Sequence, residues 1–230
     1  MTTARPPRQF VASTFYRVRP EWRRLDLETR SRGRREAVAV VDEYRPVIFV
    51  RSYSLVGTRA DGDLMLWKAA AELEIFQRLE ADLNRTEMGG YLERPYHYLG
   101  AMRPSTYASA LHPEREGQPR VRSRHGRYLF VYPFVKARSW YRLSRAIREE
   151  LMREHVEVGR QYPEFEVNAA DSFGLDDQEF VVSFGGDDPH RFQDLVMELR
   201  ETGASGHTER DVPIFTCLAT DLTQALELAA

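Results

Sequence analysis

The sequence of 230 residues lacks the features that would assign it to a membrane or secreted class. It holds a single cysteine, Cys217, so no internal disulfide can form, which is usual for proteins of a reducing compartment. No stretch approaches the roughly eighteen apolar residues of a membrane span, and the start, MTTARPPRQF, has no apolar core of a signal peptide. We therefore expect a cytoplasmic protein without membrane insertion.

Strong net charge and protein-only metal motifs are also absent. The formal net charge is -2 at pH 7, which gives no electrostatic reason to expect nucleic acid as a partner. The sequence has no HExxH motif, no CxxC motif and no close pair of histidines. A zinc site made of protein side chains alone is therefore not expected.

The chain does contain an internal repeat. YRVRPEWRRLDLETRSRGRREAVAVV, from Tyr16, aligns with FVKARSWYRLSRAIREELMREHVEVG, from Phe134, at an offset of 118, which places Trp22 on Trp140 and Ala37 on His155. The match resumes downstream at an offset of 116, and small loop differences explain the change. A repeat of this length predicts two copies of one structural unit.

Hydrophobic periodicity predicts the same order of elements in each copy: strand, helix, two strands, helix, strand. This order is typical of the ferredoxin-like fold, so the fold class expected is α+β with tandem ferredoxin-like repeats. The predicted strands and helices are, in the first copy, strand 10–16, the strand pair within 47–66, helix 70–83 and strand 96–101, and in the second, strand 128–134, a helix over about 145–162, the strand pair within 165–184, helix 190–200 and strand 214–219.

The repeat sets the expected domains. Residues 1–118 form the N-terminal repeat, including part of a connecting loop over 102–127, and residues 119–230 form the C-terminal repeat. The loop is rich in Pro, Gly, Ser and Arg and carries His112 and His125. A connection of this length is either a solvated basic linker or a flap that binds an anion and contributes to a pocket.

His155 is the residue at which the two copies differ most in chemistry. In the helix over about 145–162, Ile147, Leu151, His155 and Val158 fall on one stripe, so we expect the imidazole to point inward among apolar groups. An inward histidine is either a core residue hydrogen-bonded to a neighbour or, without protein co-ligands, an axial ligand to haem, where the porphyrin supplies four nitrogens.

Four further segments resemble one known family. YPFVKARSWY from Tyr132, EHVEVGRQYP from Glu154, SFGLDDQEFVV from Ser172 and DLVMELRETGAS from Asp194 are similar to the coproheme decarboxylase branch of the chlorite dismutase family. HVEVGR departs from the usual HGxxGR of the family, which bears on local helix packing rather than on ligation.

The resemblance implies a fold and a set of site residues. The two ferredoxin-like repeats would form a dimeric α+β barrel within one chain, with haem in the C-terminal repeat, and members of this type are typically homopentamers. His155 would be the proximal iron ligand, Tyr132 the redox tyrosine and Lys136 a residue near the propionates. Trp140 would belong to the haem pocket, and Glu198 would accept a hydrogen bond from the other ring nitrogen of the proximal histidine.

The implied substrates are Fe-coproporphyrin III (coproheme) and hydrogen peroxide, and the product is haem b. A saturated propionate offers no electron sink for a carbanion, so a radical route is easier. In that route an oxidised tyrosine takes a hydrogen atom from the propionate β-carbon, and loss of carbon dioxide leaves a vinyl group. Tyr132 and Lys136 are four residues apart on a predicted strand, so both should point to one ligand edge.

Assignment of the chain to one branch of the family depends on the residues on the distal side of the haem. Chlorite dismutases carry a distal arginine about thirteen residues after the proximal histidine, where this chain has Asn168, or Val167 if a one-residue indel lies earlier. We expect Asn168 to contact the cofactor, and chlorite is disfavoured as substrate. His112 matches the distal histidine of some decarboxylases, and His125 is the second candidate.

Other functions on the same fold stay open at this point. The chain could be a haem-binding or haem-trafficking protein, a chlorite dismutase-like haem peroxidase, or a relative that has lost haem. It could also be a haem-independent, monooxygenase-like ferredoxin pair, in which His155 would be a core residue. The presence of both Tyr132 and Lys136 favours the decarboxylase.

Overall fold

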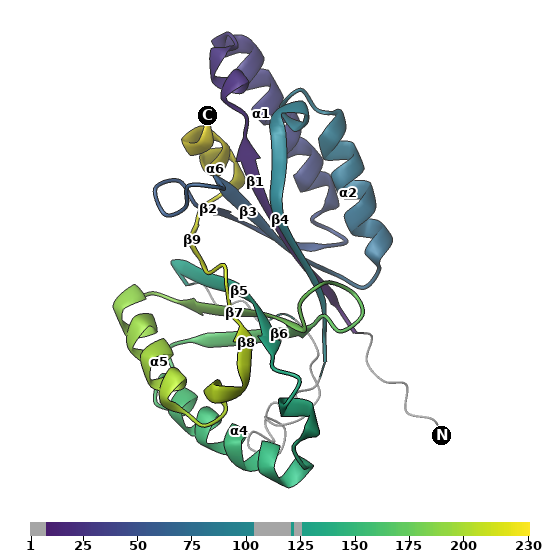
Figure 1. Ribbon diagram of the computed structural model, residues 1–230. Coiled ribbons are helices and arrows are strands. Elements are labelled where there is room, and N and C mark those ends of the chain that lie inside the picture. Colours follow the sequence, from purple (N-terminus) through teal and green to yellow (C-terminus); the bar gives the residue numbers. More distant parts are fainter. Residues whose placement is uncertain (1–7, 104–120, 122–125) are drawn as a thin grey trace. The chain divides into compact units, whose positions relative to one another are not determined.

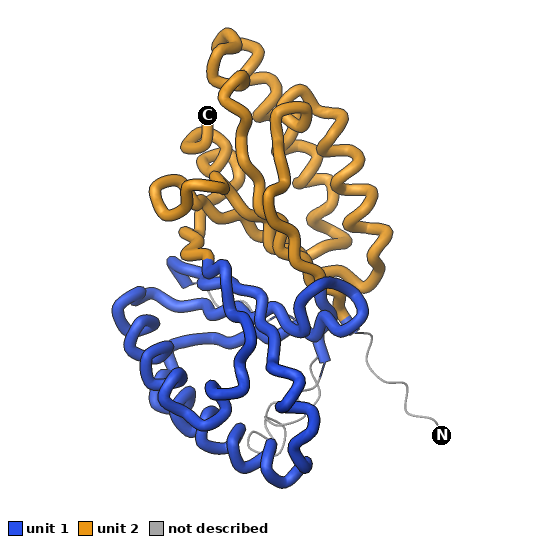
Figure 2. Tube along the Cα trace, viewed as in Figure 1, with its two compact units in different colours: residues 1–8, 100–214 blue, residues 9–99, 215–230 orange. Residues whose placement is uncertain are grey.

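The computed structural model describes residues 8–103, 121 and 126–230, and these form a mixed α+β structure (Figure 1). The structure divides into two compact units (Figure 2). The N-terminal unit comprises residues 9–99 and 215–230, and the C-terminal unit comprises the described residues of 1–8 and 100–214. No helix in the described ranges combines the length and the apolar character needed to cross a membrane.

The N-terminal unit follows the predicted order of elements and adds a strand and a helix from the chain's end. Its sheet has the strand order β4-β1-β3-β2-β9. Its elements are β1 (Phe10–Val18), the 3-10 turn η1 (Pro20–Arg24), α1 (Leu27–Tyr44), β2 (Phe49–Ser54), β3 (Leu64–Ala70), α2 (Leu73–Arg85), η2 (Met88–Tyr91), β4 (Leu92–Met102, of which 92–99 lie in this unit), β9 (Phe215–Ala219) and α6 (Leu222–Ala229).

Helices α1 and α2 lie side by side against this sheet (Figure 1). In α2 the buried residues recur at spacings of one, three and four, so one face of the helix is apolar. That face joins a closed core with η1, α1 and α6, which includes Trp22, Ala37, Leu79 and Leu226.

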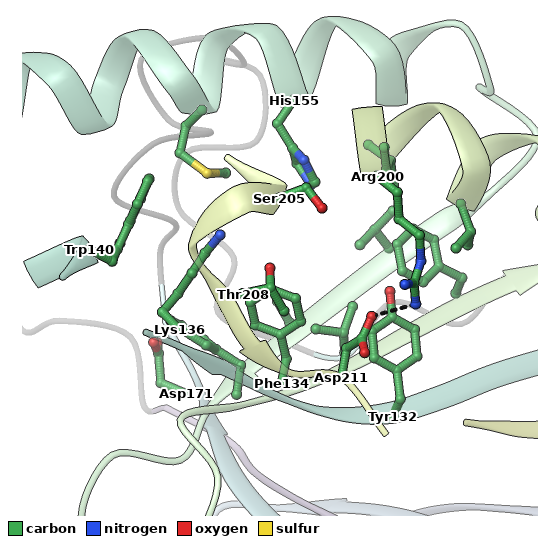
Figure 3. A pocket seen from close by; sticks show the side chains of 18 of the residues that line it. Tyr132, Phe134, Lys136, Trp140, His155, Asp171, Arg200, Ser205, Thr208 and Asp211 are labelled. Atoms are coloured by element: carbon green, nitrogen blue, oxygen red, sulfur yellow. Dashed lines mark hydrogen bonds and ion pairs between the residues drawn. The ribbon is translucent and has the colours of Figure 1, made fainter. Parts of the chain in front are cut away.

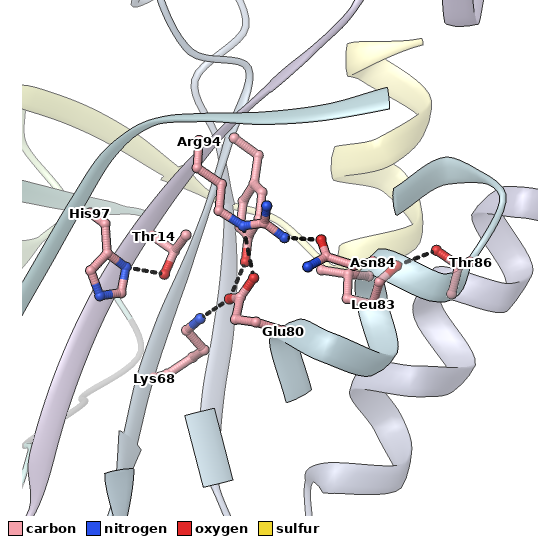
Figure 4. A network of polar contacts seen from close by, with 9 residues as sticks. Thr14, Lys68, Glu80, Leu83, Asn84, Thr86, Arg94 and His97 are labelled. Carbon is pink, nitrogen blue, oxygen red and sulfur yellow. Dashed lines mark hydrogen bonds and ion pairs between the residues drawn. The ribbon is translucent and has the colours of Figure 1, made fainter. Parts of the chain in front are cut away.

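A polar network is buried in the same unit (Figure 4). Lys68 of β3 is fully buried and donates to Glu80 of α2, which also accepts from the Tyr16 hydroxyl at 2.6 Å and from Arg94 Nε at 3.0 Å. Burial disfavours the charged carboxylate, but Lys68, Tyr16 and Arg94 together outweigh burial, and the pKa of Glu80 falls to about 2. The lysine therefore keeps its counter-ion at any physiological pH.

The C-terminal unit has the predicted order of the second copy. Its sheet has the strand order β6-β7-β5-β8, and the last residues of β4, which belong to this unit, pair with β6 through Ala101 and Asp171. Its elements are β5 (Tyr128–Lys136), η4 (Trp140–Arg142), α4 (Arg145–Arg160), β6 (Glu166–Asp171), β7 (Phe180–Gly186), α5 (Pro189–Glu201), η5 (Ser205–His207) and β8 (Thr208–Arg210).

Strand register supports the two offsets read from the sequence. In the N-terminal unit Thr14 of β1 pairs with Leu66 of β3, and in the C-terminal unit Tyr132 of β5 pairs with Val182 of β7. The first members of these pairs differ by 118 positions and the second by 116. The strand pairs β1–β3 and β5–β7 therefore have the same register at these offsets.

The compact units do not divide at the predicted boundary between residues 118 and 119. β9, predicted as the last strand of the C-terminal repeat, lies in the N-terminal compact unit, where it pairs with β2 through Tyr53 and Ala219. Within the C-terminal unit the short strand β8 pairs with β5. Helix α6 comes after β9 in the chain. Its apolar face, with Leu222 and Leu226, packs into the N-terminal core.

This placement predicts that the chain's end stabilises the N-terminal unit. Leu226→Ala should lower the free energy of unfolding by about 3 kcal/mol, because Leu226 is buried in that core and its truncation leaves a cavity. Leu228→Ala is the matched control, since Leu228 lies in the same helix and is 51% exposed. Guanidinium denaturation of both variants tests this, and equal losses would contradict the packing of α6.

Candidate functional site

The C-terminal unit holds a pocket of about 490 Å³ (Figure 3), a volume typical of sites for small organic ligands. Its walls come from the sheet, from helices α4 and α5, and from the turns η4 and η5. The residues that line it are mostly apolar or aromatic. They are Arg103, Tyr132, Phe134, Lys136, Trp140, Tyr141, Met152, His155, Val167, Ala169, Asp171, Phe173, Phe180, Val182, Phe184, Val196, Leu199, Arg200, Ser205, Thr208 and Asp211.

Strand alternation decides which residues of β5 and β6 face the pocket. On β5 these are Tyr132, Phe134 and Lys136, so Tyr132 and Lys136 share a face, as their spacing predicts. On β6 the lining residues are Val167 and every second residue after it, whereas Asn168 is 5% exposed on the opposite face. Asn168, which is predicted to contact the cofactor, therefore does not line this pocket, whereas its neighbour Val167 does.

His155 lies on α4 with its imidazole directed into the pocket (Figure 3). Burial, and then the nearby charge of Lys136, lowers the pKa of His155 to about 4. The ring is therefore neutral at pH 7. Its Nδ1 lies 3.2 Å from the Thr202 hydroxyl.

The inward stripe predicted on α4 is only partly correct. Ile147 is 49% exposed, and Leu151 and Val158 are half-buried. The part of the helix that faces the pocket carries Met152 and His155. The stripe prediction fails because α4 covers an open pocket and contributes no fully buried residue.

Glu198, which is predicted to accept a hydrogen bond from His155, has a different partner in this structure. Its Oε1 accepts a hydrogen bond from the Tyr162 hydroxyl at 2.6 Å, while the oxygen beside His155 Nδ1 is that of Thr202. Thr202 belongs to the same family-like segment, DLVMELRETGAS, four residues beyond Glu198.

Lys136 is buried at the end of β5. Its Nζ donates to the Ala204 carbonyl at 2.6 Å and lies 4.6 Å from the centre of the Trp140 ring, so Trp140 lines the pocket as predicted. Burial lowers the pKa of Lys136 to about 8, although Glu179, which accepts from the Lys136 backbone N–H at 2.8 Å, opposes this shift. The pocket therefore holds a poorly solvated ammonium group.

Tyr132 lies beside an ion pair that the sequence did not indicate (Figure 3). Arg200 of α5 donates to Asp211 at 2.7 Å, and both line the pocket with Tyr132. Burial raises the pKa of Tyr132, and Asp211 adds to this effect. The phenol therefore keeps its proton. Helical spacing could have identified Arg200, because it is four residues after the pocket residue Val196.

Three cationic side chains line this pocket, and two of them have acidic partners there. Arg103 lies 3.8 Å from Asp171, Arg200 pairs with Asp211, and Lys136 donates to a carbonyl. Arginine pairs with carboxylates in a fixed geometry and can exchange one carboxylate for another. An apolar ligand with carboxylates at its periphery fits this distribution of charge.

Metal binding by protein side chains alone is not supported within the described ranges. No group of three or more His, Cys, Asp or Glu residues there could hold an ion. Both predicted distal histidines, His112 and His125, lie outside the described residues.

Comparison with known proteins identifies the family. The family model described as chlorite dismutase matches residues 30–220. The chain belongs to the chlorite dismutase family.

Individual proteins of known structure or function are also similar to this chain. A coproheme decarboxylase from Mycolicibacterium smegmatis is 31% identical over 175 residues, which cover 76% of this chain and 74% of that protein. A mutant chlorite dismutase from Candidatus Nitrospira defluvii has the same fold, with a TM-score of 0.88, 24% identity and coverage of 96% of both chains. A haem-binding protein from Thermus thermophilus has a TM-score of 0.84 and 26% identity, with coverage of 96% of this chain and 95% of that one.

The low pKa of Lys136 predicts a specific dependence of stability on pH. The folded state releases the Lys136 proton near pH 8 and the unfolded state near pH 10.5, so the unfolded state binds more protons between these values. The free energy of unfolding of the wild type should therefore rise relative to that of Lys136→Met over this range, by up to roughly 3 kcal/mol. Below pH 8 the difference should be constant down to the range in which His155 titrates, because the charge of Lys136 also lowers the pKa of His155.

Denaturant titrations at several pH values measure this difference. The sequence contains only one other lysine, Lys68, which is present in both proteins and cancels in the comparison. A difference that does not change between pH 8 and pH 10.5 would show that Lys136 is solvated as an ordinary surface lysine.

Proposed function

We propose that this protein is a coproheme decarboxylase, a haem-dependent enzyme that uses hydrogen peroxide to decarboxylate two propionates of Fe-coproporphyrin III and gives haem b. The observation that carries the proposal is the neutral His155 directed into a largely apolar pocket that also contains a tyrosine and three cationic side chains. The similarity to a coproheme decarboxylase supports the same reaction.

The residues present fit an iron porphyrin. A neutral imidazole is the form of histidine that binds iron, and a porphyrin supplies the four nitrogens that the described protein residues do not. Aromatic and aliphatic side chains from β6 and β7, such as Phe180 and Val182, offer a face suited to a macrocycle. His155 would hold the iron, and Trp140 would pack at the edge of the ring.

The cations would bind the propionates. Lys136 is poorly solvated, so an incoming carboxylate would compensate the cost of its burial. Arg200 could exchange Asp211 for a propionate, and Arg103 could exchange Asp171 in the same way. Arg200 also lies on the side of the pocket that holds Tyr132, so a carboxylate bound there would be close to the phenol (Figure 3).

When bound, the iron porphyrin supplies with peroxide the oxidising equivalents of the reaction. Tyr132 would give up its hydrogen atom and recover one from the β-carbon of a propionate. Loss of carbon dioxide and of a second electron from that propionate leaves the vinyl group. Burial holds Tyr132 in its protonated form, which is the form that can act as a hydrogen-atom relay. The apolar walls would keep water from the radical.

The reaction also needs a base that takes a proton from hydrogen peroxide. We retain His112 for this role, with His125 as the second candidate; both lie outside the described residues. At the site expected for the distal arginine of chlorite dismutases, neither Val167 nor Asn168 carries a positive charge. This departure favours the decarboxylase over a chlorite-consuming enzyme.

We also propose the higher-order features implied by the family. The element order of each unit is consistent with two ferredoxin-like repeats that close one barrel, in a cytoplasmic homopentamer. Size-exclusion chromatography with light scattering tests the pentamer.

A haem-binding or haem-trafficking protein is the second candidate function. The similarity to a haem-binding protein from Thermus thermophilus favours it. This function needs His155 and the cations but not the hydroxyl of Tyr132, so the two candidates predict different results for one variant.

Tyr132→Phe separates these two functions. The variant keeps the aromatic ring and its stacking on Phe184, so coproheme should bind with near-normal affinity. Product formation should nearly stop, because an O–H group needed only in the reaction has been removed. Mass spectrometry of the porphyrin after peroxide addition measures this. Haem b formed at the wild-type rate would exclude the radical role of Tyr132.

His155→Ala tests ligation. Removing the imidazole should greatly weaken porphyrin binding and abolish the absorption spectrum of a histidine-ligated ferric iron. His190→Ala is the matched control, because His190 lies exposed on α5 outside the pocket. Titration of the purified variants with coproheme measures both effects, and an unchanged spectrum in His155→Ala would assign the iron to another ligand.

A further inference from the structure

Thr202 contacts the ring nitrogen of His155 that points away from the pocket. It is the residue at which α5 ends, and it is 5% exposed. Its hydroxyl donates its only hydrogen to the Leu199 carbonyl at 2.7 Å. The same oxygen lies 3.2 Å from His155 Nδ1, so toward the imidazole it can act only as an acceptor.

This arrangement determines the tautomer of His155. Because the Thr202 oxygen accepts, Nδ1 must carry the hydrogen, and the lone pair of the neutral ring is on Nε2. Nε2 is therefore the nitrogen available to a ligand in the pocket.

The N-terminal unit contains the same helix end without the histidine (Figure 4). Thr86 is the counterpart of Thr202 at the offset of 116, ends α2 in the same way, and donates to the Leu83 carbonyl at 2.7 Å. Its oxygen accepts from the backbone N–H of Gly89 at 3.0 Å. Ala37 occupies the position of His155.

A second contact is preserved between the repeats. Glu36 accepts from the backbone N–H of Glu87 at 3.2 Å, and its counterpart Glu154 accepts from the backbone N–H of Gly203 at 2.8 Å. The two helix ends thus keep the same glutamate contact and the same threonine-to-carbonyl bond. They differ in what the threonine oxygen accepts, which is a backbone N–H in one unit and the imidazole N–H in the other.

The carboxylates near His155 are engaged elsewhere. Glu154, the residue before it, bonds to Gly203, and Glu198 bonds to the Tyr162 hydroxyl. The hydrogen-bond partner of Nδ1 is therefore an uncharged hydroxyl whose orientation is fixed by Leu199.

We propose that Thr202 is the positioning residue for His155, which presents Nε2 to the pocket and gives the iron ligand a neutral partner instead of a carboxylate. This inference rests on the proposed function, because it concerns the histidine that would bind the porphyrin iron. A carboxylate partner would make the imidazole more basic and its bond to iron stronger. With Thr202, the iron–histidine bond should be weaker and the reduction potential higher than with a carboxylate.

Four variants test the proposal, of which Thr202→Asp is used only in the complex with coproheme. Thr202→Val removes the acceptor and nearly keeps the shape of the side chain. Thr202→Ser keeps the hydroxyl and should restore the wild-type behaviour. Thr86→Val is the matched control, because it removes the same threonine-to-carbonyl bond from a helix end that has no histidine.

The first measurement uses the protein without porphyrin. Nitrogen-15 NMR of the imidazoles should show His155 protonated at Nδ1 in the wild type, in Thr202→Ser and in Thr86→Val. Thr202→Val should show a mixture of tautomers, while its melting temperature falls about as much as that of Thr86→Val. A single Nδ1–H tautomer in Thr202→Val, or a mixture in Thr86→Val, would overturn the proposal.

The second measurement uses the complex with coproheme. Thr202→Val should raise the dissociation constant on the order of tenfold, as is usual for loss of a partner of a metal ligand. Thr202→Asp should raise the iron–histidine stretching frequency and lower the midpoint potential. An unchanged frequency and potential in Thr202→Asp would overturn the electronic part of the proposal.

The two readouts separate this proposal from the function on which it rests. If the tautomer depends on Thr202 but His155→Ala binds coproheme with a wild-type spectrum, the contact stands and His155 is not the iron ligand. If His155 is the ligand but its tautomer is unchanged in Thr202→Val, the proposed function stands and the role of Thr202 is excluded.

Discussion

Each unit must cover one face of its sheet with two helices, and what fills the space beneath the helices determines whether a ligand can enter. In the N-terminal unit the space is filled by Ala37, by the apolar face of α2 and by the buried Lys68–Glu80 pair. In the C-terminal unit the counterparts of Lys68 and Glu80 are Phe184 and Val196, which line the pocket. One repeat closes its core with an ion pair, and the other keeps the corresponding region open.

The two units differ in how they compensate the charge of a buried lysine. Lys68 has Glu80 as its counter-ion, and Lys68, Tyr16 and Arg94 together lower the pKa of this carboxyl to about 2. Lys136 has a carbonyl as its hydrogen-bond acceptor, and its pKa falls to about 8 because burial disfavours the ammonium form. Glu179 offsets only part of this effect. A buried charge that is incompletely compensated lowers stability, and at a pocket it favours a ligand of opposite sign.

Much of the fold could be predicted from the sequence, because the repeat and the hydrophobic periodicity are local signals. The pairing of β9 with β2 could not be predicted, because it depends on contacts between segments far apart in the sequence. The face on which Asn168 lies could not be predicted for a different reason. Side chains alternate along a strand, so an error of one residue in β6 moves the prediction to the opposite face of the sheet.

Site residues can be predicted where their spacing along a strand fixes the face that they share. They cannot be predicted where their position depends on tertiary contacts. Tyr132 and Lys136 share a strand face at any tertiary arrangement, and the structure places both in one pocket with His155. The partner of His155 could not be read from spacing, because Glu198 and Thr202 are one helical turn apart and both lie near α4. Thr202 is selected by the end of α5, where the helix leaves its terminal side chain beside the imidazole.

Helices α2 and α5 end in the same way in the two units. This similarity explains why a histidine could be placed beside α5 with little loss of stability. Thr86 shows that this helix end already provides an oxygen acceptor in a unit that has no imidazole. Replacing the alanine of one unit by the histidine of the other therefore requires no new acceptor, because the existing threonine oxygen takes the imidazole N–H. A buried imidazole needs a partner for each of its nitrogens, and in this unit the fold supplies one while the pocket leaves the other for the ligand.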